Sequence, residues 1–136
     1  MVEINIEYQG DLHCEAVHGP SGTCLSTDAP VDNQGRGESF SPTDLCATAL
    51  GTCMATIMGI QARTLDIDLK GMTVKVGKTM SADQPRRIAQ LDVGISVPGQ
   101  LSEKHRQQLI RAAEHCPVHY SLHPDVRINL NFNWEN

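Results

Sequence analysis

Residues 41–60 read SPTDLCATALGTCMATIMGI, and the fold of the chain is expected to form around this stretch. Ser41 can cap a helix, Pro42 suits the first helical position, and Asp44 is favoured near the positive end of the helix dipole. The residues from 45 to 60 carry no charge and are apolar on nearly every side of a helix. The stretch therefore predicts a helix that is buried in the middle of the fold.

Alternating apolar and polar residues predict β-strands on both sides of this helix. The expected strands lie within residues 2–8, 12–16, 23–27, 72–76, 91–97 and 126–134. Ser102 caps a second predicted helix, which should stop at Cys116 because Pro117 disfavours helical geometry in the residue before it. The order β-β-β-α-β-β-α-β predicts an α+β fold with antiparallel sheets around the central helix, forming a single domain over residues 1–136.

Composition and charge narrow the classes of function. The net charge is −5 and the basic residues are scattered, so the chain lacks the clustered footprint of a nucleic-acid-binding protein. The N-terminus alternates like a strand and not like a signal peptide, and residues 45–60 are fewer than the roughly 20 apolar residues of a membrane span. We expect a soluble, cytoplasmic protein with no membrane or nucleic-acid partner. Because aromatic residues make up only 4% of the chain, the core is built from smaller side chains, and a homodimer would add buried surface.

The five cysteines are the residues most able to carry chemistry. An odd number without a secretory context does not indicate a disulfide framework, so each cysteine is structural, metal-binding or catalytic. Cys53 lies inside the central helix, and Cys116 lies at the exit of the second helix. Cys46 is expected to pack in the central helix, and Cys14 and Cys24 are expected to be structural residues of the N-terminal strands.

Cys53 and Cys116 could form a redox pair if the fold brings them together. A reactive thiol needs a cation, a metal or a helix N-terminus to lower its pKa, and Cys53 lies too far into its helix to gain much from the dipole. The sequence offers four cations that could reach it from elsewhere, namely Arg36, Arg63, His115 and His119. Cys116, at a helix C-terminus, suits a resolving thiol that condenses with a sulfenic acid.

Two other interpretations of these cysteines stay open. Both can be small apolar core residues, as most buried cysteines are. A zinc site is the other competitor, since four potential ligands lie close together and Cys53 could be a fifth: His115, Cys116, His119 and His123. The chain has no Cys-x-x-Cys pair, and a helix exit followed by Pro117 does not hold these side chains on one face, so we expect no metal.

Two strings resemble a known family over essentially the whole chain. Residues 41–53, SPTDLCATALGTC, resemble the first-cysteine helix of the OsmC/Ohr family (osmotically inducible protein C and organic hydroperoxide resistance protein). Residues 112–119, AAEHCPVH, look like the second-cysteine motif of that family, and the order of the elements agrees. The resemblance implies an OsmC-like fold and an intertwined homodimer with two active sites at the subunit interface.

The resemblance also implies an activity. Well-studied members are thiol-dependent peroxidases that reduce organic hydroperoxides in oxidative-stress defence and use no metal, flavin, haem or other cofactor. By resemblance, Cys53 would be the peroxidatic thiolate and Cys116 the resolving thiol, and an external dithiol or thiol would reduce the disulfide between them. The alternative is an OsmC-like thiol protein that binds a small apolar or electrophilic ligand without turnover.

The chain departs from the family at the residues that activate the first cysteine. The best-characterised members carry a glutamate two residues after the helix cap, paired with an arginine from the N-terminal part of the chain. Thr43 occupies the glutamate position here, and no arginine precedes Arg36. Arg36, Asp44 and Glu38 are the candidate replacements, and the chain is predicted to be a divergent OsmC-like member.

Overall fold

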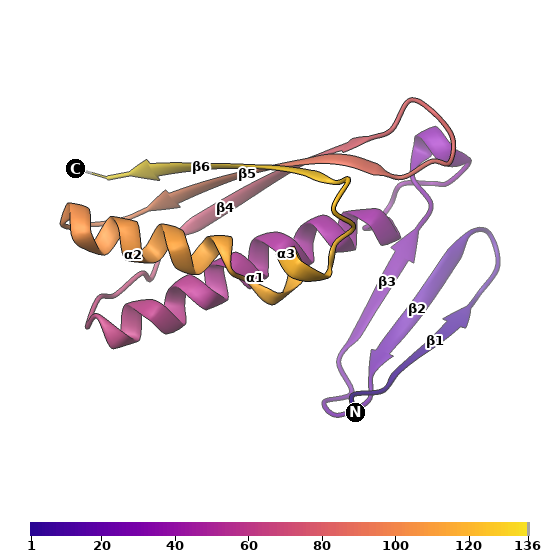
Figure 1. Ribbon diagram of the computed structural model, residues 1–136. Coiled ribbons are helices and arrows are strands. Elements are labelled where there is room, and N and C mark those ends of the chain that lie inside the picture. Colours follow the sequence, from indigo (N-terminus) through magenta and orange to yellow (C-terminus); the bar gives the residue numbers. More distant parts are fainter. Residues whose placement is uncertain (136) are drawn as a thin grey trace. The chain divides into compact units, whose positions relative to one another are not determined.

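The computed structural model describes residues 1–135, and its elements follow the predicted order with two short helical segments in addition (Figure 1). The chain forms β1 (Ile4–Tyr8), β2 (His13–His18), β3 (Cys24–Asp28), the 3-10 turn η1 (Val31–Asn33), α1 (Pro42–Thr64), β4 (Thr73–Met80), β5 (Ile88–Val97), α2 (Glu103–Glu114), α3 (Pro117–Ser121) and β6 (Arg127–Trp134). It divides into two compact units, unit 1 (Met1–Cys46) and unit 2 (Ala47–Asn136). The predicted α+β class is confirmed.

Unit 1 contains an antiparallel sheet in the order β1-β2-β3. The pleat places Ile4, Ile6 and Tyr8 on one face, where they are 59%, 68% and 63% exposed. Ala16 pairs with both Ile6 and Leu25, so Leu25, which is 46% exposed, extends the same face. An exposed apolar face of this kind is typical of an interaction surface.

The loop after β3 folds tightly back on itself. A Cβ atom added to Gly35 would lie 1.7 Å from the carbonyl oxygen of Ala29, so the close approach requires glycine at this position. The chain then returns to β3, where the Asp28 N–H donates to the Phe40 carbonyl at 3.0 Å. This return brings residues 37–40 next to the start of α1.

Helix α1 is capped by Ser41, as the sequence predicted, and Asp44 makes the cap reciprocal. The Asp44 N–H donates to Ser41 Oγ at 3.0 Å, and the Ser41 N–H donates to Asp44 Oδ2 at 2.9 Å. This is a capping box in which aspartate takes the place of the usual glutamate. The Asp44 carboxylate therefore has a structural task at the helix start.

Unit 2 contains a second three-stranded sheet in the order β4-β5-β6. β4 and β5 pair antiparallel, whereas β5 and β6 pair parallel, so the expectation of purely antiparallel sheets is wrong here. The parallel pair arises because α2 and α3 cross over between β5 and β6, as parallel neighbours require. In Figure 1, α1 and α2 lie on the same side of this sheet.

The core of unit 2 lies between this sheet and the helices. α1 contributes Leu50, Met54 and Met58, which have no exposed surface, and β5 contributes four side chains that are 0–2% exposed: Leu91, Val93, Ile95 and Val97. Gly51 allows a close approach, since a Cβ atom there would lie 2.8 Å from Val76 Cγ2 of β4.

Burial of α1 differs from the prediction in extent. One face is buried, Cys53 is partly buried, and Ile60 is 57% exposed, so the helix is not buried all round. The length argument from residues 45–60 also does not hold for α1, whose 23 residues are long and apolar enough to cross a membrane. Core helices of water-soluble proteins meet the same criterion, and the buried residues of α1 belong to the core of unit 2.

Candidate functional site

The fold brings Cys53 and Cys116 together in unit 2. Cys53 of α1 is partly buried and packs against the core cluster to which the fully buried Cys116 belongs. Cys53 lies close enough to Cys116 to raise the pKa of its thiol, and both are free cysteines. Residues that lie on different helices and far apart in the sequence thus form one pair of thiols.

Cys116 occupies a different position in its helix from the one predicted. α2 ends at Glu114, so the predicted stop before Pro117 is confirmed. Pro117 then begins α3, and Cys116 is the N-cap of that helix, with Sγ accepting the His119 N–H at 3.4 Å. The prediction that Cys116 forms the C-terminus of the second helix is therefore wrong. Pro117 suits the first position of a new helix, so Cys116 caps the start of α3.

Burial raises the pKa of the Cys116 thiol. The His119 N–H opposes this change by a smaller amount, while the hydrogen bond with Cys53 and its charge raise the pKa further. Cys116 is therefore a protonated thiol at neutral pH. A protonated thiol suits the predicted resolving role, and its cause is burial and not a helix C-terminus.

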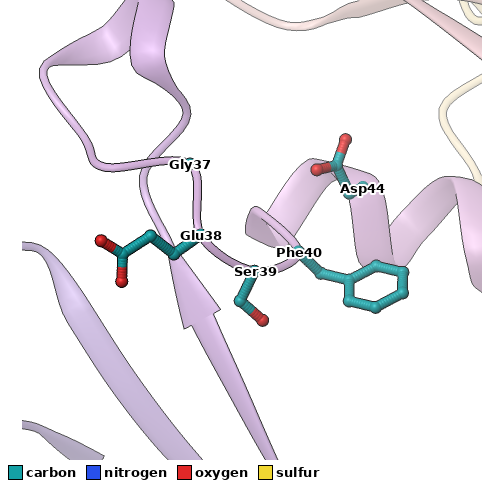
Figure 2. Close-up of a pocket in the computed structure, with 5 residues that line it drawn as sticks. All are labelled: Gly37, Glu38, Ser39, Phe40 and Asp44. Atoms are coloured by element: carbon teal, nitrogen blue, oxygen red, sulfur yellow. The ribbon is translucent and has the colours of Figure 1, made fainter.

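Glu38 and Asp44 line one shallow, open pocket in unit 1 (Figure 2). The pocket has a volume of about 440 Å³, and the other residues that line it are Gly37, Ser39 and Phe40. The two carboxylates point in different directions, and that of Asp44 takes part in the helix cap. The pocket thus contains both predicted acidic residues but does not pair them.

Two of the four predicted cations, Arg36 and Arg63, lie at the surface of their units. Arg36 forms an ion pair with Asp11, with 3.2 Å between Nη2 and Oδ2, and both side chains are more than half exposed. Exposed pairs of this kind contribute little to stability. Arg63 is exposed in the last turn of α1.

A polar pair in unit 1, between His13 and the buried Asp28, was not predicted from the sequence. Asp28 is 4% exposed, and its Oδ1 lies 2.7 Å from His13 Nδ1. The two residues are direct partners across β2 and β3, and only the strand register could have revealed this pairing.

The potential zinc ligands do not gather into a site. Within residues 1–135, no group of three or more histidine, cysteine, aspartate or glutamate side chains is arranged to hold a metal ion. Two predictions for the other cysteines are wrong: Cys46, expected to pack, and Cys24, expected to be structural, are both exposed.

Comparisons with known proteins identify the family. The model of the family "OsmC-like protein" matches residues 35–131. The crystal structure of a candidate osmotic stress induced and detoxification response protein from Psychrobacter arcticus 273-4 is 44% identical, with a TM-score of 0.93 over 98% of this chain and 96% of that one. No curated protein matches the sequence.

More distant structures share the fold. The organic hydroperoxide resistance protein OsmC from Legionella pneumophila is 16% identical, with a TM-score of 0.77 over 98% of this chain and 96% of that one. An organic hydroperoxide resistance protein from Elizabethkingia anophelis is 12% identical, with a TM-score of 0.79 over 99% and 96%. With the family model covering most of the sequence, the chain belongs to the OsmC-like protein family.

Proposed function

We propose that the protein reduces organic hydroperoxides, with Cys53 as the attacking thiolate and Cys116 as the resolving thiol. The observation that carries this proposal is the contact between the two thiols in the core of unit 2. Membership of the OsmC-like family supports it, as do the organic hydroperoxide resistance proteins among the structural relatives. The role that follows is defence against oxidative stress.

The difference in burial supports this assignment of roles to the two cysteines. Cys53 is partly exposed, whereas Cys116 has no exposed surface, so a peroxide that arrives from solvent meets Cys53 first. The raised pKa keeps Cys116 protonated and therefore unreactive during this step. Arg36 is the candidate cation for the Cys53 thiolate, with Glu38 and Asp44 as candidate orienting groups.

The proposed reaction has three balanced steps. The Cys53 thiolate attacks one peroxide oxygen, the O–O bond breaks, and the alkoxide leaves as an alcohol after taking a proton from solvent. Cys116 then attacks the Cys53 sulfenic acid, so an S–S bond forms and water leaves. An external dithiol reduces the disulfide and is itself oxidised, which returns both thiols.

We further propose that the protein works as an intertwined homodimer in which units 1 and 2 form one OsmC-like domain. The apolar face of unit 1 supports this, because Ile4, Ile6 and Tyr8 are each more than half exposed in the single chain. A second copy that covered this face would remove a large apolar patch from water. Light scattering should give the mass of a dimer, and Ile6→Asp should shift that mass towards the monomer. A monomeric wild-type chain would contradict the proposal.

Mass spectrometry of intact and digested protein tests the reaction. One equivalent of tert-butyl hydroperoxide should convert the reduced protein to a species that has lost two hydrogen atoms and links the Cys53 and Cys116 peptides. Cys116→Ser should instead accumulate a Cys53 sulfenic acid that dimedone traps. Cys46→Ser, at an exposed cysteine, serves as the matched control and should behave as wild type. A linkage that persists without Cys53, or no oxidation of the wild type, would overturn the proposal.

A second candidate function is binding of a small molecule at the thiols without turnover. It is favoured because Arg36, the candidate cation for the Cys53 thiolate, is engaged in an ion pair with Asp11. A structural relative from Vibrio cholerae, described as an organic hydroperoxide resistance protein, holds captopril in one of its active sites. Captopril that raises the melting temperature of a chain which consumes no peroxide would support this candidate over the first.

A further inference from the structure

α3 is a short helix whose order depends on a few local contacts. None of its five residues, all of which the structure describes, is fully buried. Helices shorter than about 12 residues are marginal in water unless packing stabilises them. The backbone bond that starts α3, from the Tyr120 N–H to the Cys116 carbonyl, is long at 3.4 Å, and the Ser121 hydroxyl donates to the Pro117 carbonyl at 2.9 Å. The loss of one such contact is therefore expected to change how much of the time α3 is folded.

The cap of α3 is the sulfur atom of the proposed resolving thiol. Cys116 is the N-cap residue, and its Sγ accepts the His119 N–H at 3.4 Å. An N-cap acceptor satisfies one of the backbone N–H groups that the first turn of a helix leaves without a partner. α2 is instead capped by a hydroxyl group, with Ser102 Oγ accepting the His105 N–H at 3.1 Å. Of these two caps, only that of α3 uses an atom that the proposed reaction changes.

The cap and the disulfide compete for this sulfur atom. The proposed reaction bonds Cys116 Sγ to Cys53 Sγ, and a disulfide fixes the direction of each sulfur within narrow limits. Cys53 belongs to α1, so the new bond directs Cys116 Sγ towards α1, whereas the cap directs it towards the first turn of α3. Formation of the disulfide is therefore expected to weaken the cap.

His119 gives the folded α3 an additional cost. Its Nδ1 is buried and has no hydrogen-bond partner among residues 1–135. A buried polar atom without a partner destabilises the folded form, because water would bind this atom if it were exposed. Local unfolding of α3 would return Nδ1 to water, so the cap has to offset this cost for α3 to stay folded.

We propose that α3 is a redox switch, folded while Cys116 is a thiol and locally unfolded once Cys116 is bonded to Cys53. The inference rests on the proposed function, because it uses the disulfide that this function requires. In that step the hydrogen atom of Cys116 and the hydroxyl group of the Cys53 sulfenic acid leave together as water. The external dithiol reverses the switch, since it returns one hydrogen atom to each sulfur and is itself oxidised to a disulfide. The oxidised protein thus presents a loosened chain next to Cys116 at the stage when the dithiol must reach the disulfide.

Hydrogen exchange followed by mass spectrometry tests the switch. In a protein with Cys14→Ser, Cys24→Ser and Cys46→Ser, diamide oxidises the two remaining thiols to the disulfide, and its N=N bond takes up the two hydrogen atoms. Peptide mapping confirms the linkage. The amides of residues 118–122 should then exchange about twofold to fivefold faster than in the reduced protein, as expected for the loss of a helix cap. α2, whose cap is a hydroxyl group, is the internal control, and residues 103–114 should exchange equally in both states.

Two variants separate the cap from the disulfide. Neither Cys116→Ser nor Cys116→Ala can form the disulfide, but the serine hydroxyl is a preferred cap, whereas alanine has no acceptor. Without oxidant, residues 118–122 should exchange about fivefold faster in Cys116→Ala than in Cys116→Ser. Cys53→Ser keeps the thiol cap and should remain as protected after diamide treatment as before it. Equal exchange in the two Cys116 variants, or a disulfide that leaves α3 fully protected, would overturn the inference.

The choice of oxidant distinguishes this inference from the proposed function. If diamide forms the disulfide and unfolds α3 but tert-butyl hydroperoxide never oxidises the protein, the peroxidase proposal fails and the switch stands. If tert-butyl hydroperoxide forms the disulfide and the exchange of α3 does not change, the switch fails and the peroxidase proposal stands. If neither oxidant forms the disulfide, both proposals fail.

Discussion

The two units of the chain differ in where their apolar side chains lie. In unit 2, the β5 residues Leu91, Val93 and Ile95 are 0–1% exposed, because helices cover their face of the sheet. In unit 1, every residue of β1 is exposed, including Ile6 at 68%. Unit 2 therefore has its own core, in which two thiols can be held in contact, whereas unit 1 has a sheet that lacks a cover of its own.

Removing Cys53 tests where the chemistry lies and should have the largest effect. Cys53→Ser should reduce the consumption of tert-butyl hydroperoxide to the rate of buffer alone, since no other thiol contacts Cys116 in the described part of the chain. Peroxide loss is measured colorimetrically with dithiothreitol as the reductant. Cys24→Ser, at an exposed cysteine of unit 1, should retain full activity. A Cys24→Ser variant that loses activity would move the chemistry out of unit 2.

A cavity in the core of unit 2 should cost more stability than the same change in unit 1. Leu50→Ala removes a side chain with no exposed surface, and we expect a loss of about 2–5 kcal/mol in the free energy of unfolding. Ile6→Ala should change that free energy far less at low protein concentration, where a dimer dissociates. Urea denaturation followed by circular dichroism measures both variants. Equal losses would show that unit 1 has a core within the single chain.

Unit 1 should nevertheless depend on the pair between the buried Asp28 and His13. His13→Ala leaves the Asp28 carboxylate buried without its 2.7 Å partner, so we expect a loss of about 1–3 kcal/mol. Hydrogen exchange should localise the loss to β2 and β3. Arg36→Gln, which breaks an exposed pair in the same unit, is the matched control and should leave exchange nearly unchanged.

The smallest expected effect is a dependence of stability on pH in unit 2. The pKa of Cys116 is raised on folding from the ordinary value of 9.0. The contribution of the protonated thiol to the free energy of unfolding is therefore complete below pH 9.0 and is lost as the pH rises through the folded pKa. Melting temperatures should therefore fall more steeply above pH 9.0 for wild type than for Cys116→Ala. Parallel curves for the two proteins would show that burial of Cys116 does not depress its ionisation.

Local signals were sufficient for most of the elements. Ser41, Pro42 and Asp44 marked the start of α1 because capping is a contact between residues close in the sequence. The parallel pairing of β6 with β5 was missed, since strand direction depends on how the intervening segment crosses the sheet. The proline that ends one helix also begins α3, and periodicity does not reveal a helix of five residues.

The sequence identified the two cysteines of the candidate site but not the residues that surround them. Cys53 and Cys116 stood out through their helical context, yet their contact is produced by the packing of α1 in the core. Cys46 was expected to pack because it shares the helix face of Cys53, but the pattern does not tell how far along α1 the covering elements extend. His119 Nδ1 is buried without a hydrogen-bond partner among residues 1–135, and this depends on three-dimensional packing that the spacing of residues does not encode.

Gly51 limits how freely relatives of this chain can vary. A methyl group at this position would lie 2.8 Å from Val76 and 3.3 Å from Val74, so it would push α1 away from β4. Cys53 lies two positions further along the same helix and would move with it. A relative could thus retain both cysteines and still lose their contact through one added carbon. The residue at the position of Gly51 is therefore as informative about inherited activity as Cys53 and Cys116 themselves.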